Sequence, residues 1–257
     1  MPALTEIIKR DILDGTLPRF LYKYRQIDAT LERIINDSSL WFADPLSFND
    51  PFDCQIQPDT QNTIKEIRDY ISKSSPGISE TDINRIVKNI SDDPNYWPST
   101  LEKIIKKSIS SKGICCFASH NLSVLMWSHY ANCHKGISMK FDVTLDLDFF
   151  VHPIKVNYSD DYPIYNHIRD NKNLVKLLIQ NKSSIWNYEE EVRILKDKVG
   201  VNHFKKEALV EITFGSNCDY DDMIRIRKLM FSNGYDNTIF MRAKTSKAKY
   251  MLEFEKF

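Results

Sequence analysis

The segment from residue 113 to residue 142 constrains the fold more than any other part of this sequence. It reads GICCFASHNLSVLMWSHYANCHKGISMKFD. Ile114–Ala118 and Ile137–Phe141 are short apolar runs of strand length, and Leu122–Ala131 between them has the spacing of a helix. This strand–helix–strand pattern predicts the unit around which the rest of the chain is organised.

The remaining elements predict an α+β fold. Further strands are expected at residues 20–25, 40–43, 151–158, 188–195, 208–214, 237–242 and 250–254, and further helices at 4–13, 28–36, 171–186 and 219–231. Residues 60–110 carry three helical patterns separated by Ser-Pro-Gly and Asp-Pro breaks, and predict a helical insertion or lid. We therefore expect one domain over residues 1–257, with a mainly antiparallel or mixed central sheet flanked by helices and this insertion.

Charge and cysteine content narrow the class of protein. Lys and Arg number 35, as do Asp and Glu, which argues against a strongly basic nucleic-acid-coating protein but allows a local basic patch. The five cysteines are an odd number and Cys115 and Cys116 are adjacent, which does not favour a disulfide framework and points to a reducing, cytoplasmic location. The sequence shows neither a signal-peptide pattern nor an apolar run of membrane-spanning length, so no membrane partner is expected.

The predicted central helix places several polar aromatic groups close together. Leu122, Leu125, Met126 and His129 are expected on one face, with Trp127 and Tyr130 at its edges. His129 and Cys133 lie four residues apart, but no second pair with matching spacing exists, so no metal site is predicted. The cysteines are interpreted as small buried apolar residues.

A cluster of glutamates follows at WNYEEEVRIL, residues 186–195. If residues 188–195 form a strand, Glu189, Glu191 and Arg193 share one face. Adjacent carboxylates repel one another unless cations or a ligand neutralise their charge, and Arg193 could hold Glu191 in place. The pattern fits a carboxylate that binds a ribose hydroxyl or acts as a base, or else the solvated outer face of an edge strand.

Two further segments could contribute binding groups. In LYKYR, Tyr22 and Tyr24 share one face of the expected strand, and Lys23 and Arg25 share the other. The loop DPLSFNDPFD, residues 44–53, should be ordered by its prolines and by two phenylalanines packed on the core, either as a structural turn or as part of a site. The basic C-terminal third is either a solvated surface or a groove for phosphate or nucleic acid.

Together these segments resemble a known family. LYKYR with LWFADPLSFNDPFD, then CFASHNLSVLMWSHYANCHKGISMKFD and then WNYEEEVRIL, are similar to the bacterial domain of unknown function 2971 family. Val192 departs from the pattern, because the family usually has Trp there. The resemblance implies a bacterial protein associated with mobile elements or phage defence, and its layout also resembles ADP-ribosyltransferase-type toxins.

The second resemblance implies roles for named residues. Arg25 would bind NAD phosphate or ribose, Tyr130 or His129 would line the nicotinamide pocket, and Glu189 or Glu191 would be the catalytic carboxylate. The expected catalytic residues are thus Glu189, Glu191 and His129, and the expected substrate-binding residues are Tyr24, Arg25, Asn49, Asp50, Trp127, Ser128, Tyr130, Lys135 and Arg193. NAD is the expected co-substrate.

Two other functions stay open at this point. One is a sensor or toxin component that binds a nucleotide or a partner through the same pocket without turnover. The other is a nuclease that holds a metal with Asp44, Asp50 and Asp53 together with Glu189 and Glu191. The NAD-using enzyme requires one cleft, with a wall from Trp127, His129, Tyr130 and residues 134–136 facing Arg25 and the Glu189–Glu191–Arg193 face.

Overall fold

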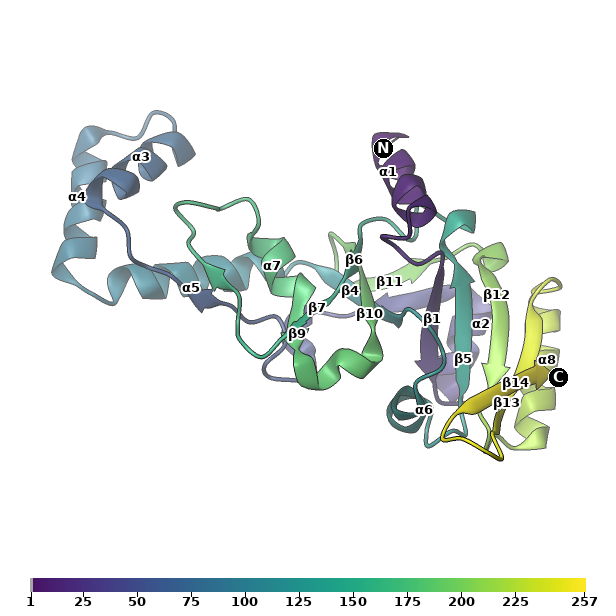
Figure 1. Ribbon diagram of the computed structural model, residues 1–257. Helices are drawn as coiled ribbons and strands as arrows, with labels where there is room; N and C mark the ends of the chain where they lie inside the picture. The colour runs from purple at the N-terminus through teal and green to yellow at the C-terminus, as the bar shows by residue number, and fades with distance from the viewer. Residues whose placement is uncertain (1) are drawn as a thin grey trace.

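The computed structural model describes residues 2–257, with side chains from Leu4 onward. Its main sheet has eight strands in the order β14-β13-β12-β5-β1-β4-β10-β6 (Figure 1). In chain order its strands are β1 (Phe20–Arg25), β4 (Gly113–Ala118), β5 (Ile137–Asp142), β6 (Pro153–Lys155), β10 (Glu191–Lys196), β12 (Leu209–Phe214), β13 (Ile239–Thr245) and β14 (Leu252–Lys256). All neighbours are antiparallel except β12 and β13, which are parallel and are connected through a helix. The predicted α+β class with a mixed sheet is confirmed.

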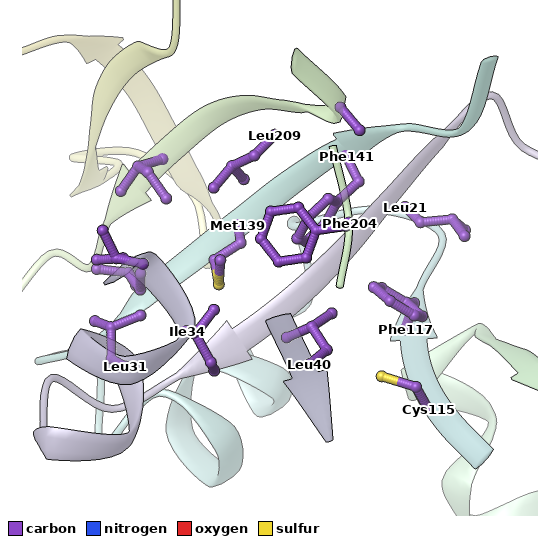
Figure 2. Close-up of a cluster of buried hydrophobic side chains, with 14 of the residues drawn as sticks. Leu21, Leu31, Ile34, Leu40, Cys115, Phe117, Met139, Phe141, Phe204 and Leu209 are labelled. Atoms are coloured by element: carbon purple, nitrogen blue, oxygen red, sulfur yellow. The ribbon is translucent and has the colours of Figure 1, made fainter. Parts of the chain in front are cut away.

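Helices cover both faces of this sheet. The N-terminal helix is α1 (Pro2–Leu13), while α2 (Ala29–Asp37) and α8 (Tyr220–Ser232) share the main core with the sheet. In that core, Leu31 and Ile34 of α2 lie near Met139 of β5, and Leu21 of β1 belongs to the same cluster (Figure 2). The short helix α6 (Val124–Tyr130) packs instead in a second cluster on β1, where Tyr24 and Trp127 meet edge to face. The strand β1 is therefore covered by α2 on one face and by α6 on the other.

The predicted helical insertion is present as three helices, which extend away from the sheet (Figure 1). They are α3 (Ile64–Ser74), α4 (Glu80–Asp92) and α5 (Tyr96–Ile109). The helices α3 and α4 have a small core of their own around Ile67, Ile83 and Val87. The third, α5, runs back and packs on α7 (Leu174–Gln180), where Leu101 and Leu178 are fully buried.

Small ladders complete the fold. They pair β2 (Ser39–Phe42) with β11 (Gly200–His203), β3 (Gln57–Pro58) with β8 (Ile164–Tyr165), and β7 (Asn157–Ser159) with β9 (Asn181–Ser183). None of the helices among residues 2–257 combines the length and apolar character that a membrane-crossing helix needs.

Two predicted elements near the glutamates are wrong. The helix predicted over 171–186 ends at Gln180, because residues 181–183 become β9 and pair in parallel with β7. Ile185, expected on its buried stripe, is 76% exposed. The strand predicted over 188–195 begins only at Glu191, because residues 184–189 form a 3-10 turn and Glu190 has a left-handed φ of 41°.

Three smaller expectations also need correction. The central helix begins at Val124, capped by Ser123, so that Leu122 precedes it and Leu125 points outward, whereas Trp127 is buried. The strand predicted over 151–158 is divided into β6 and β7. In the loop of residues 44–53 only Phe48 packs on a core, since Phe52 is largely exposed.

Candidate functional site

A cavity of about 170 Å³ lies between β1, β4 and the segment that leads into β10. We call it the Glu189 cavity. Its wall is formed by Tyr22, Lys23, Tyr24, Arg25, Phe48, Asn49, Asp53, Cys116, Phe117, Ala118, Met126, Tyr130, Lys182, Glu189 and Glu191. Segments from both halves of the sequence therefore meet at one recess.

The cavity lies where two neighbouring strands separate. The strands β1 and β4 share a single registered pair, Tyr22 with Ala118, whereas β1 pairs with β5 along its whole length. Where the ladder is missing, the Nζ of Lys23 donates a hydrogen bond of 2.6 Å to the carbonyl oxygen of Cys116. A side chain thus takes over a hydrogen bond that a neighbouring strand would normally supply.

The floor of the cavity is a buried network centred on Arg193. This side chain is fully buried, and its five N–H groups all donate: to both carboxylate oxygens of Asp53, to both of Glu191 and to the carbonyl oxygen of Ile179. The carboxylate contacts measure between 2.6 and 3.0 Å. A guanidinium has five donors and no acceptor, so Arg193 has no donor left for a substrate. It holds the two carboxylates in place.

A second cation, Lys182, connects this floor to Glu189. Its Nζ donates to Glu189 and, at 3.2 Å, to Glu191, and it lies 3.9 Å from Asp53. Three carboxylates therefore surround two cations, Lys182 and Arg193. Burying charges is tolerated only when they are paired in this way.

The charges in this network shift the pKa values of its members. Burial alone would raise the pKa of Glu191, but Arg193 and Lys182 outweigh it and lower that pKa to about 2. Burial would lower the pKa of Lys182, whereas Glu191 and Glu189 together raise it. Both groups are therefore charged at neutral pH.

Glu189 lies at the edge of the network and faces the cavity. One carboxylate oxygen accepts a hydrogen bond of 2.7 Å from the hydroxyl of Tyr130, and the other accepts from Lys182. Burial, followed by the hydrogen bond to Glu189, raises the pKa of Tyr130, so this phenol stays a donor. Each carboxylate oxygen of Glu189 can accept one more hydrogen bond, so this carboxylate has the most acceptor capacity left of the three.

The left-handed residue Glu190 separates Glu189 from Glu191 and turns its own side chain away. Glu190 accepts a hydrogen bond of 2.8 Å from the Ser119 hydroxyl and lies 3.1 Å from the His120 ring. Of the three consecutive glutamates, the outer two thus face the cavity and the middle one faces solvent. The predicted face shared by Glu189, Glu191 and Arg193 does exist, although a turn and not a strand produces it.

Arg25 lies at the other end of the cavity wall, and its side chain has few polar partners. Its Nε is buried and has no hydrogen-bond partner among the described residues. A buried donor without a partner costs free energy, and an anion in the cavity would remove this cost. Arg25 is thus the group best suited to bind a phosphate or carboxylate here.

The His-Lys-Gly segment of residues 134–136, which follows α6, packs closely against Arg25 at the end of β1. Residues 132–134 all have left-handed φ angles, between 46° and 66°, and a side chain at Gly136 would lie 2.2 Å from the carbonyl oxygen of Arg25. The ring of His134 stacks on Trp127 and contacts the Ser128 hydroxyl at 3.2 Å. The His-Lys-Gly motif thus has a structural role in this segment: it allows the tight turn after α6 and the close packing against β1.

The cavity includes some predicted site residues and leaves others outside. Tyr24, Arg25, Asn49, Tyr130, Glu189 and Glu191 line it. Trp127 is completely buried, with its Nε1 donating to the carbonyl oxygen of Asn121, and Arg193 lies beneath the floor. The other four lie elsewhere: His129 and Ser128 in a neighbouring groove, Lys135 in a third recess, and Asp50 on its own loop. The expected wall is thus reduced to Tyr130, because α6 turns Trp127 inward and His129 outward.

The carboxylates of the nuclease alternative are divided between two places. Asp53 does meet Glu189 and Glu191, but all three are paired with Lys182 and Arg193. Asp44 and Asp50 accept hydrogen bonds from backbone N–H groups two residues ahead. Among residues 2–257, no group of three or more His, Cys, Asp or Glu has the arrangement to hold a metal ion.

Lys182 is the residue of the site that sequence reasoning missed. The apolar pattern places it within a helix, where it would be one of many surface lysines. Tyr158 was missed as well: its hydroxyl accepts a hydrogen bond of 2.8 Å from the N–H of Glu191. The run of three carboxylates was the available signal, since it called for a cation beyond Arg193.

Comparison with curated proteins and with solved structures returns no match. A scan of protein families matches residues 126–194 to the family described as "Protein of unknown function (DUF2971)". The matched segment runs from α6, which carries Tyr130, to β10, which carries Glu191 and Arg193. The match supports the family expected from the sequence over residues 126–194, which are about a quarter of the chain and are similar to the DUF2971 family of proteins of unknown function.

Proposed function

We propose that the chain is an NAD-using enzyme of the ADP-ribosyltransferase type, with Glu189 as its catalytic carboxylate. The observation that carries the proposal is the position of Glu189, held by Tyr130 and Lys182 at the cavity wall with acceptor capacity to spare. A carboxylate fixed in this way can accept a hydrogen bond from a ribose hydroxyl and stabilise positive charge that develops on the sugar.

The reaction is a displacement at the ribose carbon that carries nicotinamide. The bond between this carbon and the ring nitrogen breaks, and nicotinamide leaves as a neutral molecule with the bonding electron pair. A hydroxyl of water or of an acceptor forms the new bond to the same carbon and releases its proton. Glu189 would stabilise the cationic sugar between these events, because its carboxylate is buried in the protein and faces the cavity.

The remaining groups of the cavity would orient the substrate. Arg25 has an unpaired Nε that suits a phosphate oxygen, and Tyr22, Tyr24 and Tyr130 offer ring surfaces for a flat heterocycle. Glu191 would act as a positioning residue, since its two oxygens are engaged by Arg193 and Lys182. A role in phage defence or as a toxin, implied by the family resemblance, belongs to this proposal.

Release of nicotinamide from NAD tests the proposal. Glu189→Gln keeps the size of the side chain and removes its charge, and should reduce kcat by about 100-fold or more. The matched control is Glu190→Gln, one residue away on the solvent side, which should leave kcat unchanged. Equal rates for the two variants, or no nicotinamide release by the unaltered protein, would rule the proposed chemistry out.

One observation favours the alternative of a nucleotide-binding module without turnover. All three carboxylates of the cavity already carry cationic or phenolic partners, which is how a purely structural network is also built. Such a module would show a rise in melting temperature with NAD that depends on Arg25, with no nicotinamide released. The nuclease alternative has no comparable support, because its carboxylates are divided between paired and turn-forming positions.

A further inference from the structure

A second and larger recess opens beside the Glu189 cavity. We call it the outer groove; its volume is about 830 Å³, and it lies between α2, the β2–β11 ladder and the end of α6. Arg25 and Tyr130 belong to the walls of both recesses. The two spaces are therefore neighbours that share a boundary of one cation and one phenol.

The size of the Glu189 cavity limits what it can hold. A volume of about 170 Å³ is close to that of a cavity of roughly 150 Å³ that holds one benzene ring. That is enough for one small ring or sugar, whereas a dinucleotide is several times larger. A substrate such as NAD must therefore extend beyond Arg25 and Tyr130.

The outer groove has cations available where this extension would lie. Arg33, exposed on α2, has no hydrogen-bond or ion-pair partner among the described residues, and Arg25 has its unpaired Nε. The nearby Asp28 is engaged, since it caps α2 by accepting from the N–H of Leu31 and from the Gln26 amide. Two aspartates, Asp28 and Asp37, also line the groove, so Arg25 and Arg33 are the groups within it that would contact a diphosphate.

An exposed aromatic surface lies in the same groove. Trp41 is 56% exposed, although its neighbours Leu40 and Phe42 on the same short strand are fully buried. The indole is thus presented outward, opposite Val201 of the paired strand. An exposed indole beside arginines is the combination on which nucleotide bases stack, because every base has a flat π face.

We infer that the outer groove binds the adenosine diphosphate part of the substrate. The diphosphate contacts Arg25 and Arg33, and the adenine base stacks on Trp41. This inference rests on the proposed function for what enters the Glu189 cavity, and it adds the place and the residues that would hold the far half of the dinucleotide. A mononucleotide would fill the cavity and leave the groove empty.

Calorimetric titration with ADP tests the groove directly. Trp41→Ala should weaken ADP binding by about tenfold or more, since base stacking is worth about 1–3 kcal/mol. Arg33→Gln should weaken it as well, and Trp41→Phe, which keeps a ring, should retain most of the affinity. Tyr250→Ala and Arg85→Gln alter an exposed aromatic residue and an exposed arginine elsewhere, and should change nothing.

Three results would overturn the inference. They are no ADP binding by the unaltered protein, unchanged affinity in both groove variants, and binding of a single-stranded oligonucleotide without binding of ADP. The last would assign the groove to nucleic acid instead.

Enzyme kinetics separates this inference from the proposed function. Trp41→Ala should raise the KM for NAD with little change in kcat, whereas Glu189→Gln lowers kcat. If nicotinamide mononucleotide were consumed as efficiently as NAD, the groove assignment would fail while the proposed chemistry stood. If ADP bound as expected and NAD were not consumed, the chemistry would fail while the groove assignment stood.

Discussion

The Glu189 cavity and helix α3 of the insertion each hold a glutamate whose pKa is about 2, and they do so by different means. At the insertion, the Arg169 side chain and the Thr63 cap lower the pKa of Glu66 at an exposed position. In the cavity, Glu191 is buried, and Arg193 and Lys182 must first overcome the cost of that burial. The same pKa therefore has different consequences for stability. The fold depends on the buried ion pairs of Glu191, whereas the ion pair of Glu66 with Arg169 contributes little to stability.

The largest difference between the two regions should appear on removing the buried cation. Arg193→Leu leaves Asp53 and Glu191 buried with Lys182 as the cation that neutralises their charge. The free energy of unfolding should therefore fall by about 3–5 kcal/mol. Urea denaturation followed by circular dichroism measures this loss. Arg85→Leu, at an exposed ion pair of the insertion, should have a small effect, and a similar loss in both variants would refute the contrast.

Acid should act on the buried glutamate next. The pKa of Glu191 is about 2 in the folded protein and 4.5 ordinarily, so its stabilising contribution is complete above pH 4.5 and is lost as the pH falls toward 2. This contribution amounts to about 3 kcal/mol. Unfolding free energies measured between pH 5 and pH 2 should decline accordingly, and Glu191→Gln should flatten the decline. An unchanged pH dependence in that variant would assign it to other groups.

The hydrogen bond from Tyr130 to Glu189 should have a smaller effect. Tyr130→Phe removes one donor to a carboxylate and keeps the ring, so the cost should be about 1–2 kcal/mol. Chemical denaturation gives the value, with Tyr162→Phe at an exposed site as the control. No difference between the two would mean that Lys182 alone is sufficient to hold Glu189.

The smallest effect should come from the exposed glutamate. Glu66→Gln can still complete the capping box with Thr63, so that only the charge facing Arg169 is lost. The melting temperature should fall slightly at low salt and not at all at about 1 M salt, where charges are screened within about 3 Å. A decrease that persists at high salt would show that the fold depends on this exposed pair as it does on the buried one.

The sequence predicted the pattern of strands and helices well where periodicity and local caps decide it. The strand of residues 20–25 and the helix capped by Asp28 lie close to their expected bounds, and residues 60–110 contain the three expected helices. The class of the fold follows from these elements. Whether the insertion acts as a lid stays a prediction, and none of the residues that line the Glu189 cavity comes from it.

The errors lie where distant pairing overrides local pattern. The apolar spacing of Leu174 and Leu178 continues to Ile185, but β9 is drawn out of the helix by its pairing with β7, and this brings Lys182 to the glutamates. No local signal near Lys182 encodes that partner. In the same way, the inward position of Trp127 depends on Tyr24, about a hundred residues earlier in the chain.

The central position of β1 has a consequence for the order in which the chain can fold. This strand is made early, but its neighbours β4 and β5 follow only after the whole helical insertion, and Phe20 pairs with Asp142. During synthesis β1 must therefore wait unpaired, while α3 and α4 can already close their own small core. Contacts this distant in sequence slow folding, so the insertion should acquire structure first and the sheet last.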